Sequence, residues 1–426
     1  MQSMRRPSSG SILFMITLFY VLAFSIIFIN SPETDYRGFI VAGGAVGLLY
    51  FQYGALTAFF PNVDRYVLLV ANFLCAVGMV MLYRIDPDIA IKQLVWMGIG
   101  MFFMVITMLA IRYWRAWPNL KWVLMVGSFG LLALSIVFSG SVFGAKNWFT
   151  IAGVTVQPSE FVKVLLVVAL AGVLHQYNGF SSLLVIAGYV GGCLILLLLQ
   201  KDLGAALLYA GTAIIMLYAG TSNKWLVGGA VGAVSVGSVL AYKLFPHVRV
   251  RVALWQNPWA LYESQGYQVV QGLIAIASGG LFGLGLTMGM PMAVPVRHTD
   301  FIFAVICEEF GLIIGVALVA FYLVFIVRGA IIAMDARNSF DAIMAIGCVA
   351  MITLQCFINI GGVVKLIPLT GITLPFVSYG GSSMLSCFIL LGILEGIAIK
   401  NGDADSMEFD EELYDEDDYA YDQYED

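Results

Sequence analysis

Charged residues are scarce in this 426-residue chain. Asp, Glu, Lys and Arg make up 11% of it, while hydrophobic residues make up 61%. A typical soluble globular domain carries roughly 25% charged residues. Together with a mean hydropathy of +0.92, this excludes an ordinary water-soluble fold and predicts an integral membrane protein.

Cysteine and histidine are also few, with six and three copies respectively. All six cysteines fall within apolar segments, where a thiol is usually a small core residue. The three histidines, His175, His247 and His298, are too far apart in the sequence for a typical metal-ligand spacing. We therefore expect neither a disulfide framework nor a structural zinc site, and the spacing assigns no metal.

Long apolar runs dominate the chain, and crossing a bilayer takes about 20 such residues. The runs are continuous and do not alternate with period two, which favours an α-helical bundle over a β-barrel. The prediction is an all-α membrane protein with about twelve transmembrane helices at about 11–30, 38–60, 66–84, 92–112, 121–140, 160–175, 183–199, 203–220, 225–243, 301–327, 341–366 and 374–399.

The basic residues in the short connections predict the orientation, because Lys and Arg are enriched on the cytoplasmic side. With both termini cytoplasmic, the inner set is Arg5, Arg6, Arg65, Arg112, Arg115, Lys121, Lys224, Arg328, Arg337 and Lys400. The outer set is smaller: Arg37, Arg84, Lys92, Lys146 and Lys201. The first apolar run is long for a signal peptide and no small-residue cleavage site follows it, so we interpret it as a retained anchor.

The last segment, 400–426, is strongly acidic. From Asp403 to Asp426 it carries thirteen carboxylates and neither Lys nor Arg. Such a segment cannot form a packed core, and we expect a disordered cytoplasmic tail. It could dock on a basic partner or remain a solvated, repulsive tail.

Two outer connections are long enough to carry chemistry. The first, about 141–159, leads into Glu160 and Lys163, which share one helical face and either form a self-contained ion pair or line a polar cavity. The second, about 244–300, is too long and too apolar for an ordinary loop, which predicts a folded functional element. Its cations and aromatic residues suit a phosphate-bearing lipid head group, although Trp255 or Trp259 alone would fit an interfacial belt.

The most informative stretch runs from Arg297 to Gly311 and places ionisable side chains at the start of an apolar helix. Charged groups at that depth are costly unless they are paired or face a wet cavity, so they indicate a functional site. The alternative is a cluster that extends to the interface. Paired glycines and prolines between Asn359 and Ser383 predict broken helices, which a membrane tolerates only beside protein or a polar cavity.

Six motifs occur in an order that resembles the SEDS family, the shape, elongation, division and sporulation proteins that include RodA and FtsW. They are Gln157-Pro158-Ser159-Glu160-Phe161-x-Lys163, Gln200-Lys201-Asp202-Leu203-Gly204, Asn257-Pro258-Trp259, Gly266-Tyr267-Gln268, His298-Thr299-Asp300-Phe301-Ile302-Phe303 with Glu308-Glu309-x-Gly311, and Pro375-Phe376-x-Ser378-Tyr379-Gly380-Gly381-Ser382. The resemblance covers about 66–399 and implies a ten-helix core. Residues 1–65 would then add two N-terminal helices.

The resemblance implies a peptidoglycan glycosyltransferase in the bacterial cytoplasmic membrane. Its substrate would be lipid II, the undecaprenyl-diphosphate disaccharide-peptide, and its partner a class B penicillin-binding protein. A base would deprotonate the acceptor sugar's 4-hydroxyl, and the diphosphate lipid would leave with inversion. No nucleic-acid partner is expected, and a divalent cation, Mg²⁺ or Mn²⁺, could bridge the diphosphate and carboxylates.

The catalytic position departs from the family pattern. The resemblance implies a catalytic aspartate two residues after Trp259, where this chain has Leu261, and Glu263 is the only carboxylate between Trp259 and Asp300. We therefore predict Glu263 as a substitute base, with a non-catalytic protein as the alternative. The residues expected to bind substrate are Trp148, Glu160, Lys163, Asp202, Arg249, Arg251, Arg297, His298, Asp300, Glu308, Glu309, Lys365 and Ser378.

Two other functions remain open from the sequence. A lipid II flippase or transporter would also place charged residues inside a helical bundle, but it should spread them into the cytoplasmic half. A non-catalytic scaffold for a transpeptidase would explain Leu261. The clustering of charged motifs on the outer side favours the polymerase.

Overall fold

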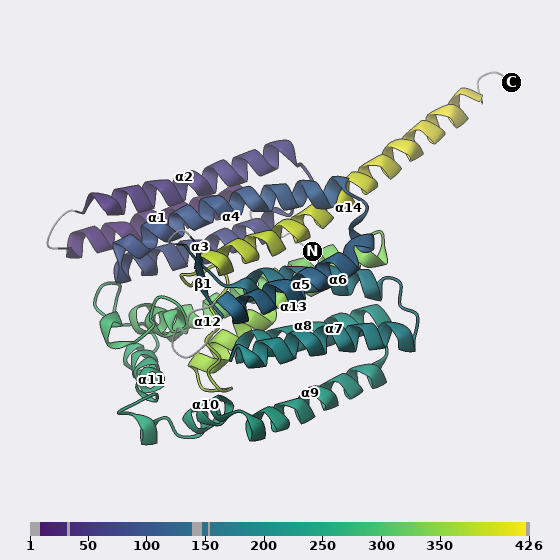
Figure 1. Cartoon of the computed structure of the whole chain (residues 1–426). Coiled ribbons are helices and arrows are strands. Elements are labelled where there is room, and N and C mark those ends of the chain that lie inside the picture. The colour runs from purple at the N-terminus through teal and green to yellow at the C-terminus, as the bar shows by residue number, and fades with distance from the viewer. Residues whose placement is uncertain (1–8, 32–34, 139–146, 152–153, 423–426) are drawn as a thin grey trace.

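Long helices make up nearly all of the computed structural model, which describes residues 9–31, 35–138, 147–151 and 154–422 (Figure 1). Side chains are described as far as Ser406, except at Ile151 and Val154. The long helices within this part of the chain are α1 (Ser9–Asn30), α2 (Tyr36–Phe59), α3 (Arg65–Ile85), α4 (Pro87–Tyr113), α5 (Lys121–Phe138), α6 (Pro158–Leu174), α7 (Phe180–Leu199), α8 (Leu203–Thr221), α9 (Lys224–Leu244), α12 (Ile302–Met334), α13 (Ser339–Val363) and α14 (Gly381–Asp422).

The predicted all-α membrane bundle is confirmed. Within the described residues, eleven helices are long and apolar enough to cross a membrane. The twelfth predicted segment is α6, which has only 17 residues. Helices suit this environment because they satisfy their own backbone hydrogen bonds in lipid. The boundaries differ by several residues: α12 runs beyond the predicted 327 to Met334, and α14 begins at Gly381 instead of at 374.

Shorter elements cover one end of the bundle. They are β1 (Phe149–Ile151), β2 (Val154–Val156), α10 (Pro246–Gln256), α11 (Tyr267–Gly279) and the 3₁₀ turns η2 (Trp259–Leu261) and η3 (Pro291–Ala293). A further turn, η1 (Trp117–Leu120), precedes α5. The strands form one antiparallel pair, and the predicted connection 141–159 lies partly outside the described residues. The connection 244–300 contains α10, η2, α11 and η3, and α11 packs against α12, so this connection is folded as predicted.

The helices are not equally enclosed. α3 and the apolar span Gly381–Ser406 of α14 are mostly buried, whereas Ala241 is the one buried residue in α9. α1 and α2 pack against α3 and α4, where the rings of Phe24 and Tyr83 lie 5.2 Å apart. The centre of the bundle thus contains α3, α6, α13 and α14, and α9 lies at its periphery.

Two interruptions shape the end that carries α10 and α11. The segment 364–380 between α13 and α14 is irregular, as the paired glycines and prolines predict, and only residues 374–378 of it are buried. A second break was not predicted: Gly311 has φ 84° inside α12. At this break the Gly285 N–H donates to the Glu309 carbonyl at 2.9 Å, so the 280–285 segment completes the hydrogen bonding of the broken helix.

The acidic tail differs from its prediction. We expected disorder across 400–426, but the described backbone continues as helix to Asp422 and projects beyond the bundle (Figure 1). A helix that is already formed in the membrane avoids the cost of nucleation, so polar residues can extend it. Two ion pairs attach the start of this extension to the rest of the bundle. Arg112 of α4 pairs with Asp403, and Arg337, between α12 and α13, pairs with Asp405.

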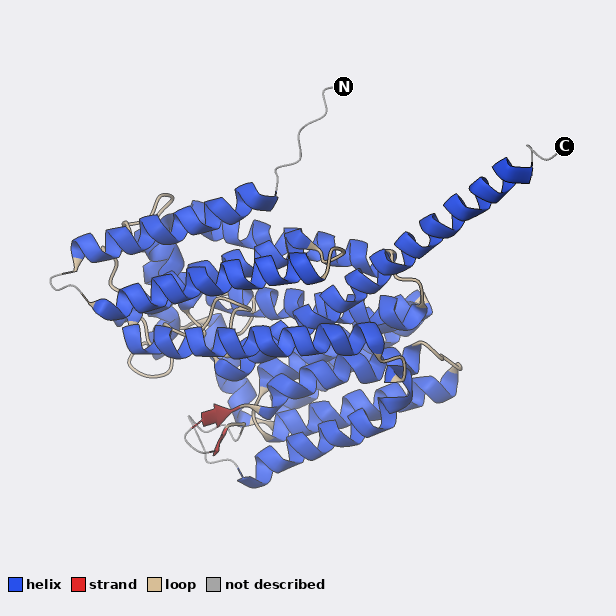
Figure 2. Cartoon of the chain, turned by 90° about the horizontal axis from the view of Figure 1, so that it is seen from above, coloured by secondary structure: helices blue, strands red, loops and turns tan. Residues whose placement is uncertain are grey.

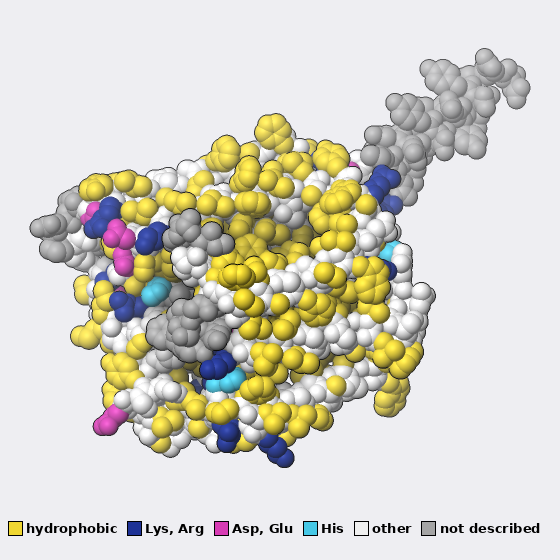
Figure 3. All heavy atoms as spheres, in the orientation of Figure 1, with side chains coloured by type: hydrophobic (Ala, Val, Ile, Leu, Met, Phe, Trp, Pro, Cys, Tyr) yellow, Lys and Arg dark blue, Asp and Glu magenta, His cyan; other side chains and the backbone are white. Residues whose placement is uncertain are grey.

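The two ends of the bundle are chemically different from its flank. In Figure 3, charged and histidine side chains gather at the ends, and hydrophobic side chains cover the surface between them. Figure 2 shows the strands at one end and the α14 extension at the other. This arrangement fits a protein that spans a bilayer, with the strands, α10 and α11 on one side of the membrane.

Candidate active site

Asp202 caps the N-terminus of α8. Its Oδ1 accepts a hydrogen bond from the Ala205 N–H at 3.0 Å. Its Oδ2 accepts from Asn147 at 3.2 Å, Gln157 at 3.0 Å and Ser159 at 3.2 Å. Such capping is typical of Asp at a helix start. Asp202 therefore joins β1, α6 and α8, and both of its oxygens are already engaged.

Arg251 projects from α10 toward the segment between α13 and α14. Its Nη1 donates to the Leu369 carbonyl at 2.6 Å. Burial lowers the pKa of this guanidinium, while the nearby charges of Asp202 and Asp300 raise it. An arginine side chain keeps its charge at neutral pH. The structure therefore brings a permanent cation within electrostatic reach of two carboxylates that are about one hundred residues apart in sequence.

Asp300 lies just before α12 and is half-buried. Burial raises the pKa of its carboxyl to about 6, although the Thr299 hydroxyl and Arg251 act in the opposite direction. Its backbone carbonyl accepts a hydrogen bond from Asn359 at 3.0 Å. A carboxylate with this pKa is mostly ionised at neutral pH and is still basic enough to accept a proton.

The segment 369–373 lies at the centre of these residues. Its carbonyls accept hydrogen bonds from Arg251 at Leu369, from Asn359 at Ile372 and from Gln355 at Thr373. The segment also lies against the start of α8, where a Cβ added to Gly204 would approach the Ile372 Cγ1 to 2.5 Å. We call Asp202, Arg251, Asp300 and residues 369–373 the charged cluster.

Glu160 and Lys163 form a separate ion pair inside the bundle. The Lys163 Nζ lies 2.6 Å from the Glu160 Oε2, and 1% of the lysine side chain is exposed. Lys163 also donates to the Gln355 Oε1 at 2.9 Å, and Ser386 donates to Glu160 at 2.9 Å. Of the two readings open from the sequence, the geometry favours the ion pair, which links α6, α13 and α14 behind the charged cluster.

Glu308 and Glu309 hold the outer loop that precedes them in sequence. Glu308 accepts from the Met290 N–H at 3.1 Å, and Glu309 accepts from the Thr287 N–H at 3.2 Å. The Arg84 Nε lies 3.3 Å from the Glu309 Oε1. This buried pair therefore attaches the 287–290 segment to α12 and α3 and lies outside the charged cluster.

Ser378 and His298 align the segment that carries Asp300. The Ser378 hydroxyl donates to the Thr299 carbonyl at 2.6 Å, and the Tyr379 N–H donates to the His298 carbonyl at 2.8 Å. Burial and the neighbouring Arg297 charge lower the pKa of His298. Arg297 itself is half-buried, and its Nε has no hydrogen-bond partner.

The remaining predicted residues lie at the edge of this end. Lys365 donates to the Gln256 carbonyl at 3.3 Å and fastens α10 to the segment after α13. Arg249, Glu263 and Leu261 are exposed, and Trp148 is half-buried. Glu263 is thus exposed and is not part of the charged cluster. The role of Glu263 as base stays a prediction.

Several polar residues near the site were not predicted. Asn147 donates a hydrogen bond to Asp202, and Gln355 accepts one from Lys163. Gln93 donates to the Ser378 carbonyl, and Arg84 donates to the Thr287 carbonyl in the 287–290 segment. Neutral amides within apolar runs are a usable signal because a buried amide needs hydrogen-bond partners. The sequence alone could not say which partners those are.

An apolar groove of about 930 Å³ leads away from the charged cluster. It is lined by α7, α8, α9 and α10 and by residues 367–370, and its lining includes Leu198, Ala206, Val234 and Arg251. Volumes of this order are typical of ligand sites. The groove therefore combines a long apolar wall with one half-buried cation, Arg251.

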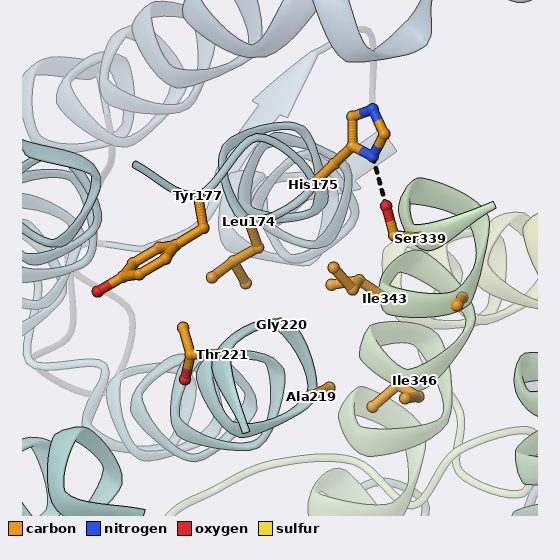
Figure 4. Close-up of a pocket in the computed structure, with 10 residues that line it drawn as sticks. Leu174, His175, Tyr177, Ala219, Gly220, Thr221, Ser339, Ile343 and Ile346 are labelled. Carbon is orange, nitrogen blue, oxygen red and sulfur yellow. Dashed lines mark hydrogen bonds between the residues drawn. The ribbon is translucent and has the colours of Figure 1, made fainter. Parts of the chain in front are cut away.

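A second hollow of about 380 Å³ lies at the opposite end of the bundle, between the ends of α6 and α8 and the start of α13 (Figure 4). His175 points across it to Ser339, with 2.6 Å between Nδ1 and Oγ. Its lining residues include no carboxylate and no Lys or Arg. We therefore assign the site to the charged cluster.

Metal ligands are sparse around the cluster. Within the described residues, no group of three or more His, Cys, Asp and Glu side chains could hold a metal ion. The six cysteines are all buried and free. A divalent cation therefore stays a prediction.

Similar proteins were found at the level of sequence and of structure. A curated relative, peptidoglycan glycosyltransferase RodA of Mycobacterium leprae (strain TN), is 34% identical over 424 residues, which cover 92% of this chain and 90% of the relative. Stage V sporulation protein E of Bacillus subtilis (strain 168) is 33% identical over 363 residues, which cover 79% of this chain and 96% of the relative.

A solved chain from a peptidoglycan synthase complex, in a study of how polymerization and crosslinking are coordinated, has a TM-score of 0.67 at 26% identity. The match covers 80% of this chain and 98% of that chain. The sequence profile of the FtsW/RodA/SpoVE family, described as "Cell cycle protein", matches residues 64–402. The chain belongs to the FtsW/RodA/SpoVE family.

Proposed function

We propose that this chain is a peptidoglycan glycosyltransferase that polymerises lipid II at the outer face of the bacterial cytoplasmic membrane. The observation that carries the proposal is the position of Arg251, which lines an apolar groove and interacts electrostatically with Asp202 and Asp300. The names of the relatives support the reaction class.

The groove fits a lipid-linked diphosphate better than a small polar substrate. An isoprenoid chain would lie along the apolar walls of α7, α8 and α9. The diphosphate would then reach Arg251, whose planar guanidinium can bind phosphate oxygens in a bidentate manner. The same cation would stabilise the negative charge that develops on the departing diphosphate.

The reaction needs a base for the acceptor's 4-hydroxyl. As that proton leaves, the oxygen forms a bond to the donor's anomeric carbon from the face opposite the diphosphate, so the configuration inverts. The sequence predicts Glu263 for this role, and that assignment remains a proposal. The proposed reaction serves cell-wall synthesis in elongation, division or sporulation, because relatives with both RodA and sporulation names match.

We also propose a class B penicillin-binding protein as the partner. The solved relative belongs to a complex that concerns both polymerization and crosslinking. Glycan strands need peptide crosslinks, so a transpeptidase bound to the polymerase would receive the strand as it forms. The proposed complex therefore joins two consecutive reactions in one membrane assembly.

The first test is polymerisation itself. We expect purified full-length protein in vesicles, with its cognate penicillin-binding protein, to convert fluorescent lipid II into long glycan that muramidase digests. Gel separation of the products measures this directly. Vesicles that transport lipid II and form no polymer would support the flippase and contradict the proposal.

The second test concerns orientation. In a variant without the native cysteines, we expect Ser264→Cys to react with an impermeant thiol reagent in intact cells and Ser406→Cys not to react. Both serines are exposed at opposite ends of the protein. Labelling is read from the mass shift of the purified protein, and the reverse pattern would place the charged cluster inside the cell.

A further inference from the structure

Thr287, in the loop between α11 and α12, has each of its three polar atoms held by a different helix. Its N–H donates to the Glu309 Oε2 of α12 at 3.2 Å, and its carbonyl accepts from the Arg84 Nη2 of α3 at 3.1 Å. Its hydroxyl oxygen accepts from the Asn30 Nδ2, at the end of α1, at 2.8 Å. We call Thr287, Glu309, Arg84 and Asn30 the loop anchor.

The backbone at Thr287 needs this support. Its φ is 78°, a conformation that is unfavourable for a β-branched residue. In the described part of the chain, six residues other than glycine have a positive φ, and five of them lie at the end that carries the charged cluster: Lys201, Thr287, Val296, Lys365 and Phe376. Such conformations persist only where the surroundings impose them, and they concentrate at functional sites. The loop anchor imposes the one at Thr287.

The contact from α1 comes from outside the part of the chain that matches the family profile. That match begins at residue 64, whereas α1 spans Ser9–Asn30. The helix is nevertheless firmly placed: the ring of Phe19 lies 5.8 Å from that of Phe73 in α3 and 6.4 Å from that of Phe310 in α12. α1 thus packs against α3 and reaches α12, the two helices that supply Arg84 and Glu309.

The loop that contains Thr287 leads into the charged cluster. From Thr287 it runs through η3 to Asp300, and near its end the Tyr379 N–H donates to the His298 carbonyl at 2.8 Å. The segment 287–300 is therefore fastened at both ends. Turnover depends on how charged groups are aligned with the substrate, and a small displacement can lower it strongly. A change at Thr287 should thus affect the charged cluster.

We infer that Asn30 is a positioning residue, which fixes Thr287 and thereby the loop that leads into the charged cluster. The inference rests on the proposed glycosyl transfer and adds α1 to the parts of the protein on which turnover depends. The apolar groove is formed by α7, α8, α9, α10 and residues 367–370. Loss of the contact between Asn30 and Thr287 should therefore lower kcat and leave KM for lipid II largely unchanged.

The test measures initial polymerisation rates of the full-length protein in vesicles over a range of fluorescent lipid II concentrations. Asn30→Ala and Thr287→Val each remove the same hydrogen bond and should each lower kcat about threefold to tenfold, with KM changing less than about twofold. Thr287→Ser keeps the hydroxyl and should keep the rate. Tyr50→Phe is the matched control because it removes the 3.1 Å hydrogen bond from Thr17, which joins α1 to α2, and it should keep the wild-type kcat.

Two further readouts separate positioning from a general loss of structure. The double variant Asn30→Ala, Thr287→Val should lose no more than the more affected single variant, because both single changes break one contact. Hydrogen exchange reads the loop without any activity. The amide N–H groups of Thr287 and Met290, which donate to Glu309 and Glu308, should exchange faster in Asn30→Ala and at the wild-type rate in Tyr50→Phe.

Three results would overturn the inference while polymerisation by the wild type still supported the function. They are a kcat of Asn30→Ala within about 1.5-fold of wild type, losses that multiply in the double variant, and an equal loss in Tyr50→Phe. A loss confined to KM would also contradict a positioning role. A wild-type protein that forms no polymer would overturn both the inference and the proposed function.

Discussion

Lys163→Met should lower the free energy of unfolding by about 3–5 kcal/mol, the range for removing one partner of a buried ion pair. Methionine keeps a long unbranched side chain, but the Glu160 carboxylate would lose the ammonium group 2.6 Å away. It would keep only the hydrogen bond from Ser386. Denaturation of the purified protein in mixed micelles measures the change.

Two control variants separate charge from packing. The double variant Glu160→Gln, Lys163→Met removes both charges and should be less destabilised than Lys163→Met alone, because no unpaired charge remains. Lys121→Met, at a lysine that donates to Gln176 near the surface, should change stability by about 0.5 kcal/mol or less. Equal stability of Lys163→Met and wild type would show that the pair does not hold the bundle together.

Arg251→Gln should reduce kcat/KM for lipid II by about 10²–10³-fold, the range for removing one donor to a developing negative charge. Glutamine is uncharged and shorter, so the change removes the cation near Asp202 and Asp300 together with the Nη1 hydrogen bond to the Leu369 carbonyl. Initial rates over a range of lipid II concentrations separate the loss of binding from the loss of turnover.

Arg249 on the same helix provides the matched comparison. It is exposed, whereas Arg251 is half-buried and hydrogen-bonded to Leu369. Arg249→Gln should therefore have a much smaller effect, and Arg251→Lys should fall in between because it keeps the charge and loses the planar fork. Similar losses for both glutamine variants would indicate a general contribution of positive charge and no specific phosphate site.

The helices could be predicted because each one needs a long apolar run to cross the membrane. The broken segment after α13 was also visible, since paired glycines and prolines disfavour a continuous helix. The break at Gly311 was not, because its hydrogen bonds come from residues 280–285, and that pairing is a tertiary contact. The α14 extension was missed because composition alone does not show that a formed helix precedes it.

The site was predictable in its residue types and not in its groupings. The sequence placed Asp202 and Asp300 in functional motifs and Arg251 among the residues expected to bind substrate. It could not show that they share one cluster, whereas Glu308 and Glu309 hold a loop and Glu160 pairs with Lys163. These groupings depend on how α6, α8, α10 and α13 pack together. Contacts between segments that are distant in sequence decide them.

The five residues 369–373 give this protein an uneven tolerance to mutation. One short stretch of backbone accepts hydrogen bonds from α10 and from two amides of α13, and Gly371 within it has φ 77°, a conformation that other residues rarely adopt. Random mutagenesis should therefore find loss-of-function substitutions concentrated here, although none of these five residues is charged. The lipid-facing side of α9, which packs against little, should accept most apolar replacements and diverge quickly between species.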